Sequence, residues 1–137
     1  LSEHPEAIAQ PDLSQAGGLS ECRRIAALCE TYDVAIAPHC PLGPLALGAC
    51  LQLAVATPNF AIQEMSLGIH YNTDGHDLLS YLRQPQVFDV REGHVAAPEA
   101  PGLGVDIDED KVRDAARTPH AWRNPVWRGR DGSLREW

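Results

Sequence analysis

Three ionisable residues at regular spacing could transfer protons in this chain. His39 lies 27 residues after Asp12, and Glu64 lies 25 residues after His39. Each comes at the carboxyl end of a short apolar run. The carboxyl ends of parallel strands meet at one edge of a sheet, where α/β enzymes place their catalytic groups. The spacing therefore predicts that the three side chains share one active-site rim.

The chemistry that these residue types offer is general acid–base catalysis. If one ring nitrogen of His39 donates a hydrogen bond to Asp12, the other nitrogen becomes a stronger base. Neighbouring strands lie about 5 Å apart, which is close enough for this contact. A partly buried Glu64 with a raised pKa could donate a hydrogen bond to a developing anion. The alternatives are an ordinary loop histidine and a solvated carboxylate, and His70 is either a rim residue or a partner of one.

Five elements are predicted to position these side chains. Short apolar runs predict three buried strands, at about residues 8–12, 34–38 and 60–64. Apolar residues at three- and four-residue steps predict a helix over 20–32 with Ser20 as its N-cap. A second helix, apolar on nearly all sides, is predicted over 44–56 with proline in its first turn. Alternating strands and helices indicate a parallel sheet, either closed into a barrel or open.

The repeat length favours compact strand–helix units. An eight-unit barrel of about 250 residues has a step of about 31 residues, close to the spacing here. An open doubly wound sheet fits the same alternation, although no G-x-G-x-x-G follows a strand. After Glu64 the pattern loosens, with a short helix predicted over 76–83 and an exposed one over 108–117. The tail carries three tryptophans, whose rings commonly pin a terminus to a domain: Trp122, Trp127 and Trp137.

Composition excludes several classes of function. The net charge of −8 disfavours nucleic acid, whose binding depends on basic patches. The four cysteines show neither C-x-x-C spacing nor a zinc-like cluster, so we expect a reducing, cytoplasmic compartment. The N-terminus does not resemble a signal peptide, and no apolar run reaches the ~20 residues of a membrane span. The chain has no initiator methionine and begins in an apparent helix tail, so we expect it to be a piece of something longer.

Five segments carry a resemblance to a known family. They include PHCPLGP at 38–44 and WRNP at 122–125, and they span residues 10–18, 37–44, 63–72, 101–108 and 122–128. Together they resemble the carboxyl-terminal part of the D-galactonate dehydratase family, in the mandelate racemase branch of the enolase superfamily. The resemblance covers essentially all 137 residues.

The resemblance implies an α/β fold, the C-terminal portion of a (β/α)7β TIM-type barrel. Residues 1–83 would supply its last three strands, and residues 84–137 would return to a separate capping domain. The family converts D-galactonate to 2-dehydro-3-deoxy-D-galactonate through a Mg²⁺-stabilised enediolate. His39 resembles the base that removes the proton at carbon 2, and Asp12 resembles the partner that orients it and raises its basicity. Glu64 resembles the acid that binds the substrate carboxylate and stabilises the enediolate.

The resemblance also sets what we expect to be missing. The Mg²⁺ ligands lie on earlier strands of the family's barrel, so no metal ligand is expected in this chain, and the chain alone is expected to be inactive. The expected partners are a small-molecule acid sugar and, at full length, further copies of the same chain, but neither nucleic acid nor membrane. The alternatives are a dehydratase of another acid sugar, a truncated non-catalytic fragment, and a small open-sheet binding domain.

Overall fold

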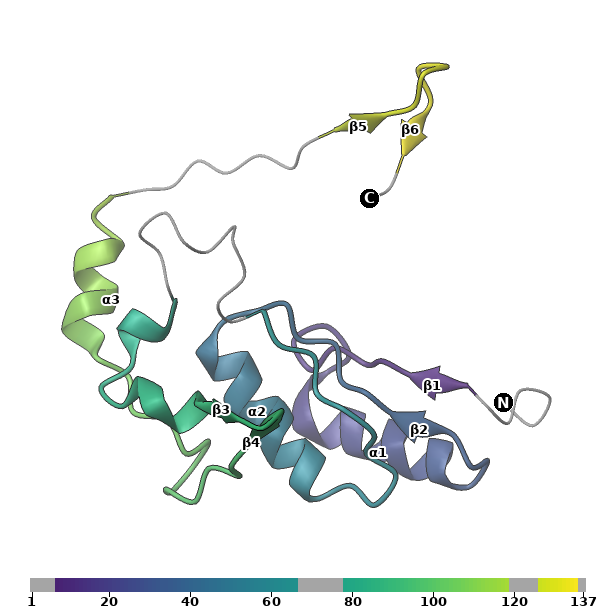
Figure 1. The fold of residues 1–137 in the computed structure, drawn as a ribbon, viewed down its shortest axis with the longest axis horizontal. Coiled ribbons are helices and arrows are strands. Elements are labelled where there is room, and N and C mark those ends of the chain that lie inside the picture. The colour runs from purple at the N-terminus through teal and green to yellow at the C-terminus, as the bar shows by residue number, and fades with distance from the viewer. Residues whose placement is uncertain (1–6, 67–77, 119–125, 136–137) are drawn as a thin grey trace.

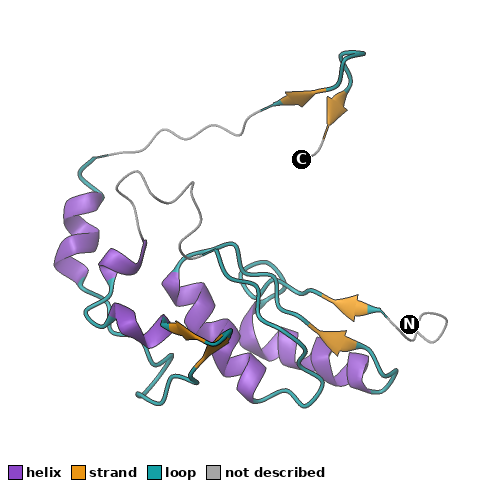
Figure 2. Ribbon diagram, viewed as in Figure 1, coloured by secondary structure: helices purple, strands orange, loops and turns teal. Residues whose placement is uncertain are grey.

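Parallel extended segments and two helices form the first half of the chain (Figure 1). The computed structural model describes residues 7–66, 78–118 and 126–135. Strand β1 (Ile8–Ala9) runs parallel to β2 (Ala35–Ile36), in the register Ile8 opposite Ala35. Helix α1 (Gly18–Glu30) connects them, and α2 (Pro44–Val55) follows β2. Helix α1 contacts β2 and α2, and Figure 2 shows both helices along one side of the two strands.

The strands are shorter than the predicted ranges of 8–12, 34–38 and 60–64. The third is not a regular strand, because Phe60 forms only an isolated parallel bridge with Ile36. Two prolines explain the shortening. Pro11 and Pro38 have no N–H to donate, so the ladder hydrogen bonds lapse at each of them. Beyond Pro11 the pairing resumes as a single parallel bridge between Asp12 and His39.

The two helices lie close to where the apolar spacing predicts them, but α1 begins and ends two residues earlier than the predicted 20–32. Gly17 and Gly18 adopt left-handed backbone angles (φ 96° and 82°), which let the chain turn into α1 two residues before Ser20. Ser20 is therefore not the N-cap; Gly17 takes that position, without a side-chain cap. Pro44 does lie in the first turn of α2.

The core lies between the helices and the extended segments. Val34 and Ile36 pack with Ala26 and Cys29 of α1, and Leu47 of α2 belongs to a second cluster. The cysteines are free thiols and act as small apolar core residues: Cys22, Cys29, Cys40 and Cys50.

The second half of the chain consists of short elements. Two 3₁₀ helices, η2 (Leu78–Tyr81) and η3 (Pro85–Phe88), precede an antiparallel pair, β3 (Val90–Arg91) and β4 (His94–Val95). Helix α3 (Glu109–Ala115) begins at its N-cap Asp108 and lies within the range predicted for it. A second antiparallel pair consists of β5 (Trp127–Arg128) and β6 (Leu134–Arg135).

The predicted helix over 76–83 is a 3₁₀ turn within the described residues. Trp122 and Trp137 lie outside the described residues, so their predicted packing stays a prediction. Within residues 7–66, 78–118 and 126–135, no helix combines the length and hydropathy needed to cross a membrane.

Candidate functional site

The end of the β1–β2 ladder brings Asp12 and His39 into contact. The His39 N–H donates to the Pro11 carbonyl at 3.2 Å, which aligns the two residues across the bridge. Their side chains then meet, with Asp12 Oδ2 2.9 Å from His39 Nδ1. Since ionised Asp12 can only accept, the proton of a neutral His39 lies on Nδ1 and Nε2 is left as the free base.

Asp12 is a half-buried carboxylate whose two oxygens accept hydrogen bonds from protein donors. Its side chain is only 10% exposed. Its second oxygen, Oδ1, accepts the backbone N–H of Ser14 at 2.7 Å. Burial by itself raises the pKa of Asp12, but the hydrogen bonds from His39 and Ser14 outweigh burial and hold the pKa below its ordinary value. Asp12 therefore stays ionised and keeps its partner oriented.

The environment of His39 makes its ring a stronger base. The hydrogen bond to Asp12 raises the pKa of His39, against the lowering effect of burial, and the charge of Glu64 raises it further. The ring is 39% exposed, so Nε2 is open to a small molecule. A base whose pKa is raised above its ordinary value, and which is reachable from solvent, is suited to abstracting a proton.

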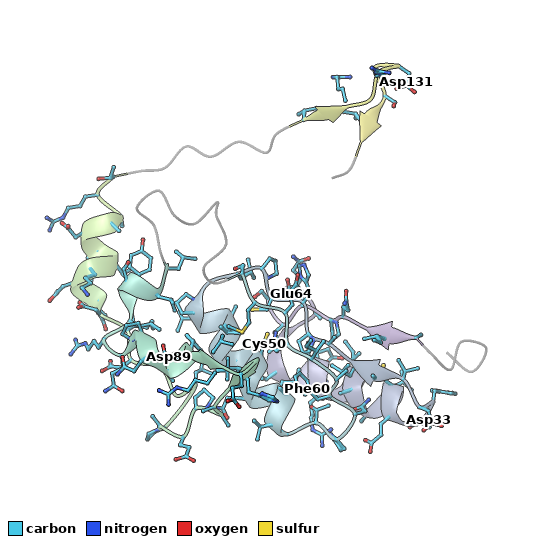
Figure 3. All side chains as sticks on the ribbon, viewed as in Figure 1. Asp33, Cys50, Phe60, Glu64, Asp89 and Asp131 are labelled. Carbon is cyan, nitrogen blue, oxygen red and sulfur yellow. The ribbon has the colours of Figure 1, made fainter. Side chains whose placement is uncertain are left out.

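Glu64 reaches the same place from the segment after α2, where Figure 3 labels it. Its Oε2 accepts the backbone N–H of Cys40 at 2.9 Å and lies 3.9 Å from His39 Nε2. The side chain is 50% exposed, so it is more open than the partly buried acid expected from sequence. The three predicted site residues nevertheless form one cluster, which disfavours the open-sheet alternative with these residues on different faces.

Two members of the cluster escaped the sequence analysis. The side-chain amide of Gln63 donates to the Pro38 carbonyl at 3.1 Å and to the Glu64 carbonyl at 2.8 Å. The other is the Cys40 backbone N–H, which no side-chain pattern reveals. The sequence does carry a signal for Gln63. It is an amide in an otherwise apolar segment that runs beside Pro38, and Pro38 has no N–H to donate to the ladder. His70 lies outside the described residues.

Beneath the cluster, two thiols interact. The Cys50 thiol hydrogen-bonds Cys40, which lowers the pKa of Cys40 and raises the pKa of Cys50. Both side chains are 1% exposed. Their burial makes them packing groups under the His39 turn, and Cys40 acts on the site through its backbone.

The described carboxylates do not form a metal site. Within the described part of the chain, no group of three His, Cys, Asp or Glu side chains could hold a metal ion. Both oxygens of Asp12 accept hydrogen bonds, and Glu64 Oε2 accepts one from Cys40. The donor set therefore fits acid–base chemistry and does not fit a Mg²⁺ shell.

Known proteins resemble this chain along its whole length. Residues 4–111 match the family described as enolase C-terminal domain-like. A D-galactonate dehydratase of Variovorax paradoxus is 54% identical over all of this chain and 36% of its own length. Another, of Ralstonia nicotianae, is 55% identical over 96% of this chain and 34% of its own. The chain thus spans about a third of the length of these curated relatives.

Solved structures agree with this assignment. An enolase from Agrobacterium radiobacter, described as a candidate galactarate dehydratase with sodium and L-malate bound, superposes with a TM-score of 0.75 at 38% identity. The match covers 93% of this chain and 33% of that one. A mandelate racemase/muconate lactonizing enzyme from Sulfitobacter gives a TM-score of 0.64 at 33% identity, over 79% of this chain and 25% of that one.

Proposed function

This chain belongs to the enolase C-terminal domain-like family, and we propose that it forms the proton-transfer half of an acid-sugar dehydratase, a hydro-lyase. The observation that carries the proposal is the 2.9 Å contact between Asp12 Oδ2 and His39 Nδ1. That contact leaves Nε2 as an exposed base, with a second carboxyl group 3.9 Å away. A base and an acid on one small-molecule site are what a β-elimination from a hydroxy acid needs.

The proposed roles follow from the positions of the atoms. His39 Nε2 takes the proton from the carbon next to the substrate carboxylate. The hydroxyl on the following carbon leaves as water with a proton supplied by an acid outside these 137 residues, and the resulting enol takes up a proton at that carbon to become a 2-keto-3-deoxy acid. Asp12 holds the ring and stabilises the imidazolium that forms. The Glu64 carboxyl group binds the substrate carboxylate, where negative charge accumulates, and stabilises the enediolate.

D-galactonate is the proposed substrate. The support is the 54–55% identity to proteins named D-galactonate dehydratase. The alternative is another acid sugar, favoured by the likeness to a structure described as a candidate galactarate dehydratase.

We further propose that residues 1–83 form the last three strands of a closed barrel and that residues 84–137 return to a capping domain. Ile8 supports this, because it shares the face of Asp12 and is 54% exposed here, whereas it would be covered inside a barrel. Mg²⁺ is proposed as a cofactor held by residues outside these 137, and no step is assigned to it. The isolated chain is proposed to be inactive, and the whole protein to be a cytoplasmic homo-oligomer.

A chimera tests the activity. Residues 1–137 would replace the matching part of the Variovorax paradoxus relative, and the chimera would be assayed with Mg²⁺ on D-galactonate, D-galactarate and other acid sugars. We expect release of a 2-keto acid from D-galactonate. His39→Asn should lower kcat by about 10²–10⁴-fold. His94→Asn, an exposed histidine on β4, is the matched control and should leave kcat unchanged.

Each outcome decides a different part of the proposal. A folded chimera that dehydrates another acid sugar and not D-galactonate overturns the proposal that D-galactonate is the substrate. A folded chimera that is inert on every acid overturns the function. Dehydration by the isolated 137-residue chain overturns the claim that it is inactive by itself.

A further inference from the structure

The segment before Glu64 is joined to the His39 strand by a side chain where the backbone cannot do so. The Ile36 N–H donates to the Asn59 carbonyl, and the Ala61 N–H donates to the Ile36 carbonyl, both at 2.9 Å. The next donor in this parallel ladder would be the N–H of Pro38, which proline lacks. The ladder therefore fails one residue before the proposed base.

Gln63 bridges this gap. Its amide uses both N–H groups, one on the Pro38 carbonyl at 3.1 Å and one on the Glu64 carbonyl at 2.8 Å. One side chain thus links the peptide that precedes His39 to the peptide that follows Glu64. The amide oxygen, Oε1, is buried and has no partner among the described residues. A buried oxygen without a partner is costly, so the two donated hydrogen bonds must offset that cost to hold the amide in this place.

The Glu64 side chain is held from a second direction. Its Oε2 accepts the Cys40 N–H at 2.9 Å, on the other side of His39 along the chain. The two links fix both the backbone and the carboxyl group of Glu64 against the His39 turn. They leave Oε2 at 3.9 Å from His39 Nε2, beyond a hydrogen bond.

That separation matters for the proposed chemistry. If Glu64 moved onto Nε2, a protonated His39 and an ionised Glu64 would form a contact ion pair. The base would then be occupied by a proton, and the acid would have none to donate. We propose that Gln63 is a positioning residue that keeps the base and the acid of this site apart. The proposal rests on the proposed function for the roles of His39 and Glu64.

The test compares two amides on the full 137-residue chain. Gln63→Leu keeps the size of the side chain and removes both donors. The matched control is Gln52→Leu, because Gln52 is also half-buried and donates to a backbone carbonyl, that of Pro98 at 3.1 Å. The readout is the pKa of His39 from its imidazole proton resonance against pH, with the resonance assigned by its loss in His39→Asn.

We expect the pKa of His39 to rise by about half a unit in Gln63→Leu and to stay within about 0.1 unit in Gln52→Leu. Adding Glu64→Gln to Gln63→Leu should remove the rise. The neighbouring groups that also act on the ring, Asp12 and Cys40, are unchanged in every variant. A pKa of His39 that does not rise in Gln63→Leu, or that rises equally in Gln52→Leu, overturns the proposal.

A second variant guards against loss of folding. Gln63→Asn keeps an amide that is one methylene too short to reach both carbonyls, and it should give the same direction of shift. In the chimera, Gln63→Leu should move the acid limb of the kcat/KM profile to higher pH by the same amount, whereas a purely structural role would leave that limb in place. The titration uses no substrate, so an inert chimera would refute the proposed function and leave this result standing.

Discussion

Replacing Asp12 by asparagine removes the charge that sets the basicity of His39 and keeps the shape of the side chain. The hydrogen bond between Asp12 Oδ2 and His39 Nδ1 is the largest cause of the raised pKa of His39. In Asp12→Asn the ring keeps a neutral acceptor at best, so we expect its pKa to fall. The same change should make the folded state less stable wherever His39 is protonated and Asp12 ionised.

The magnitude follows from the exposure of the pair. A hydrogen bond to a charged group contributes about 1.5–3 kcal/mol. Because the His39 ring is 39% exposed, solvent screening reduces this by about half, to about 1 kcal/mol. That free energy corresponds to a fall of about 0.7 unit in the pKa of His39.

The sign of the pH dependence follows from both partners. The raised pKa of His39 stabilises the fold fully below its unfolded value of 6.5, and this contribution is lost as pH rises through the folded pKa. The lowered pKa of Asp12 stabilises the fold above its unfolded value of 3.8, and this contribution is lost as pH falls through the folded pKa. The difference in unfolding free energy between the native chain and Asp12→Asn should therefore be largest between about pH 4 and 6.5.

Two measurements check this on the 137-residue chain: NMR titration of His39 and urea unfolding at pH 5.5 and 9. Asp108→Asn is the control, because Asp108 also accepts a backbone N–H, that of Lys111 at 3.3 Å, and lies on α3. It should leave the pKa of His39 unchanged. A pKa of His39 that stays within 0.2 unit of the native value in Asp12→Asn would refute the reasoning, because Asp12 would then not control the base.

Three further outcomes are expected from the core. Leu47→Ala should lower the unfolding free energy in urea by about 2–5 kcal/mol, because the side chain is 1% exposed; a loss below 1 kcal/mol would mean that the cluster is loosely packed. Asn59→Ala should cost about 1–3 kcal/mol in the same assay, since the Ala26 and Val34 carbonyls lose their donor at 3.1 and 2.8 Å. A thiol reagent should modify the cysteines slowly in the native chain and all four rapidly in urea, and rapid native labelling would contradict their burial: Cys22, Cys29, Cys40 and Cys50.

The helices could be predicted from sequence because their apolar spacing reports burial directly. Cys22, Ala26 and Cys29 recur at four and three residues and are the buried positions of α1. The start of α1 could not be read in the same way, since serine is a favoured cap and two glycines allow an earlier turn. The predicted strands are longer than the observed ones, because apolar composition alone predicts a strand. The hydrogen-bonded ladder also depends on backbone N–H groups, which Pro11 and Pro38 lack.

The candidate site was predictable where side chains carry it and hidden where the backbone does. The spacing of the strand ends was sufficient to predict that Asp12 and His39 lie together, as the bridge and the contact between them confirm. The Cys40 N–H that holds Glu64 belongs to the peptide unit, so the residue type gives no sign of it. The exposure of Glu64 was also beyond reach, because it depends on which segments surround the site and not on the local pattern.

The surface around the site bears on what those surrounding segments are. Side chains alternate along an extended segment, so Ile8 shares a face with Asp12. Ile8 is 54% exposed and would gain about 1 kcal/mol or more on burial. Polar catalytic residues at the end of an apolar inner face are the arrangement of a closed barrel, whose interior is filled with branched side chains. The face that carries the base therefore also carries apolar surface that the rest of the proposed barrel would cover.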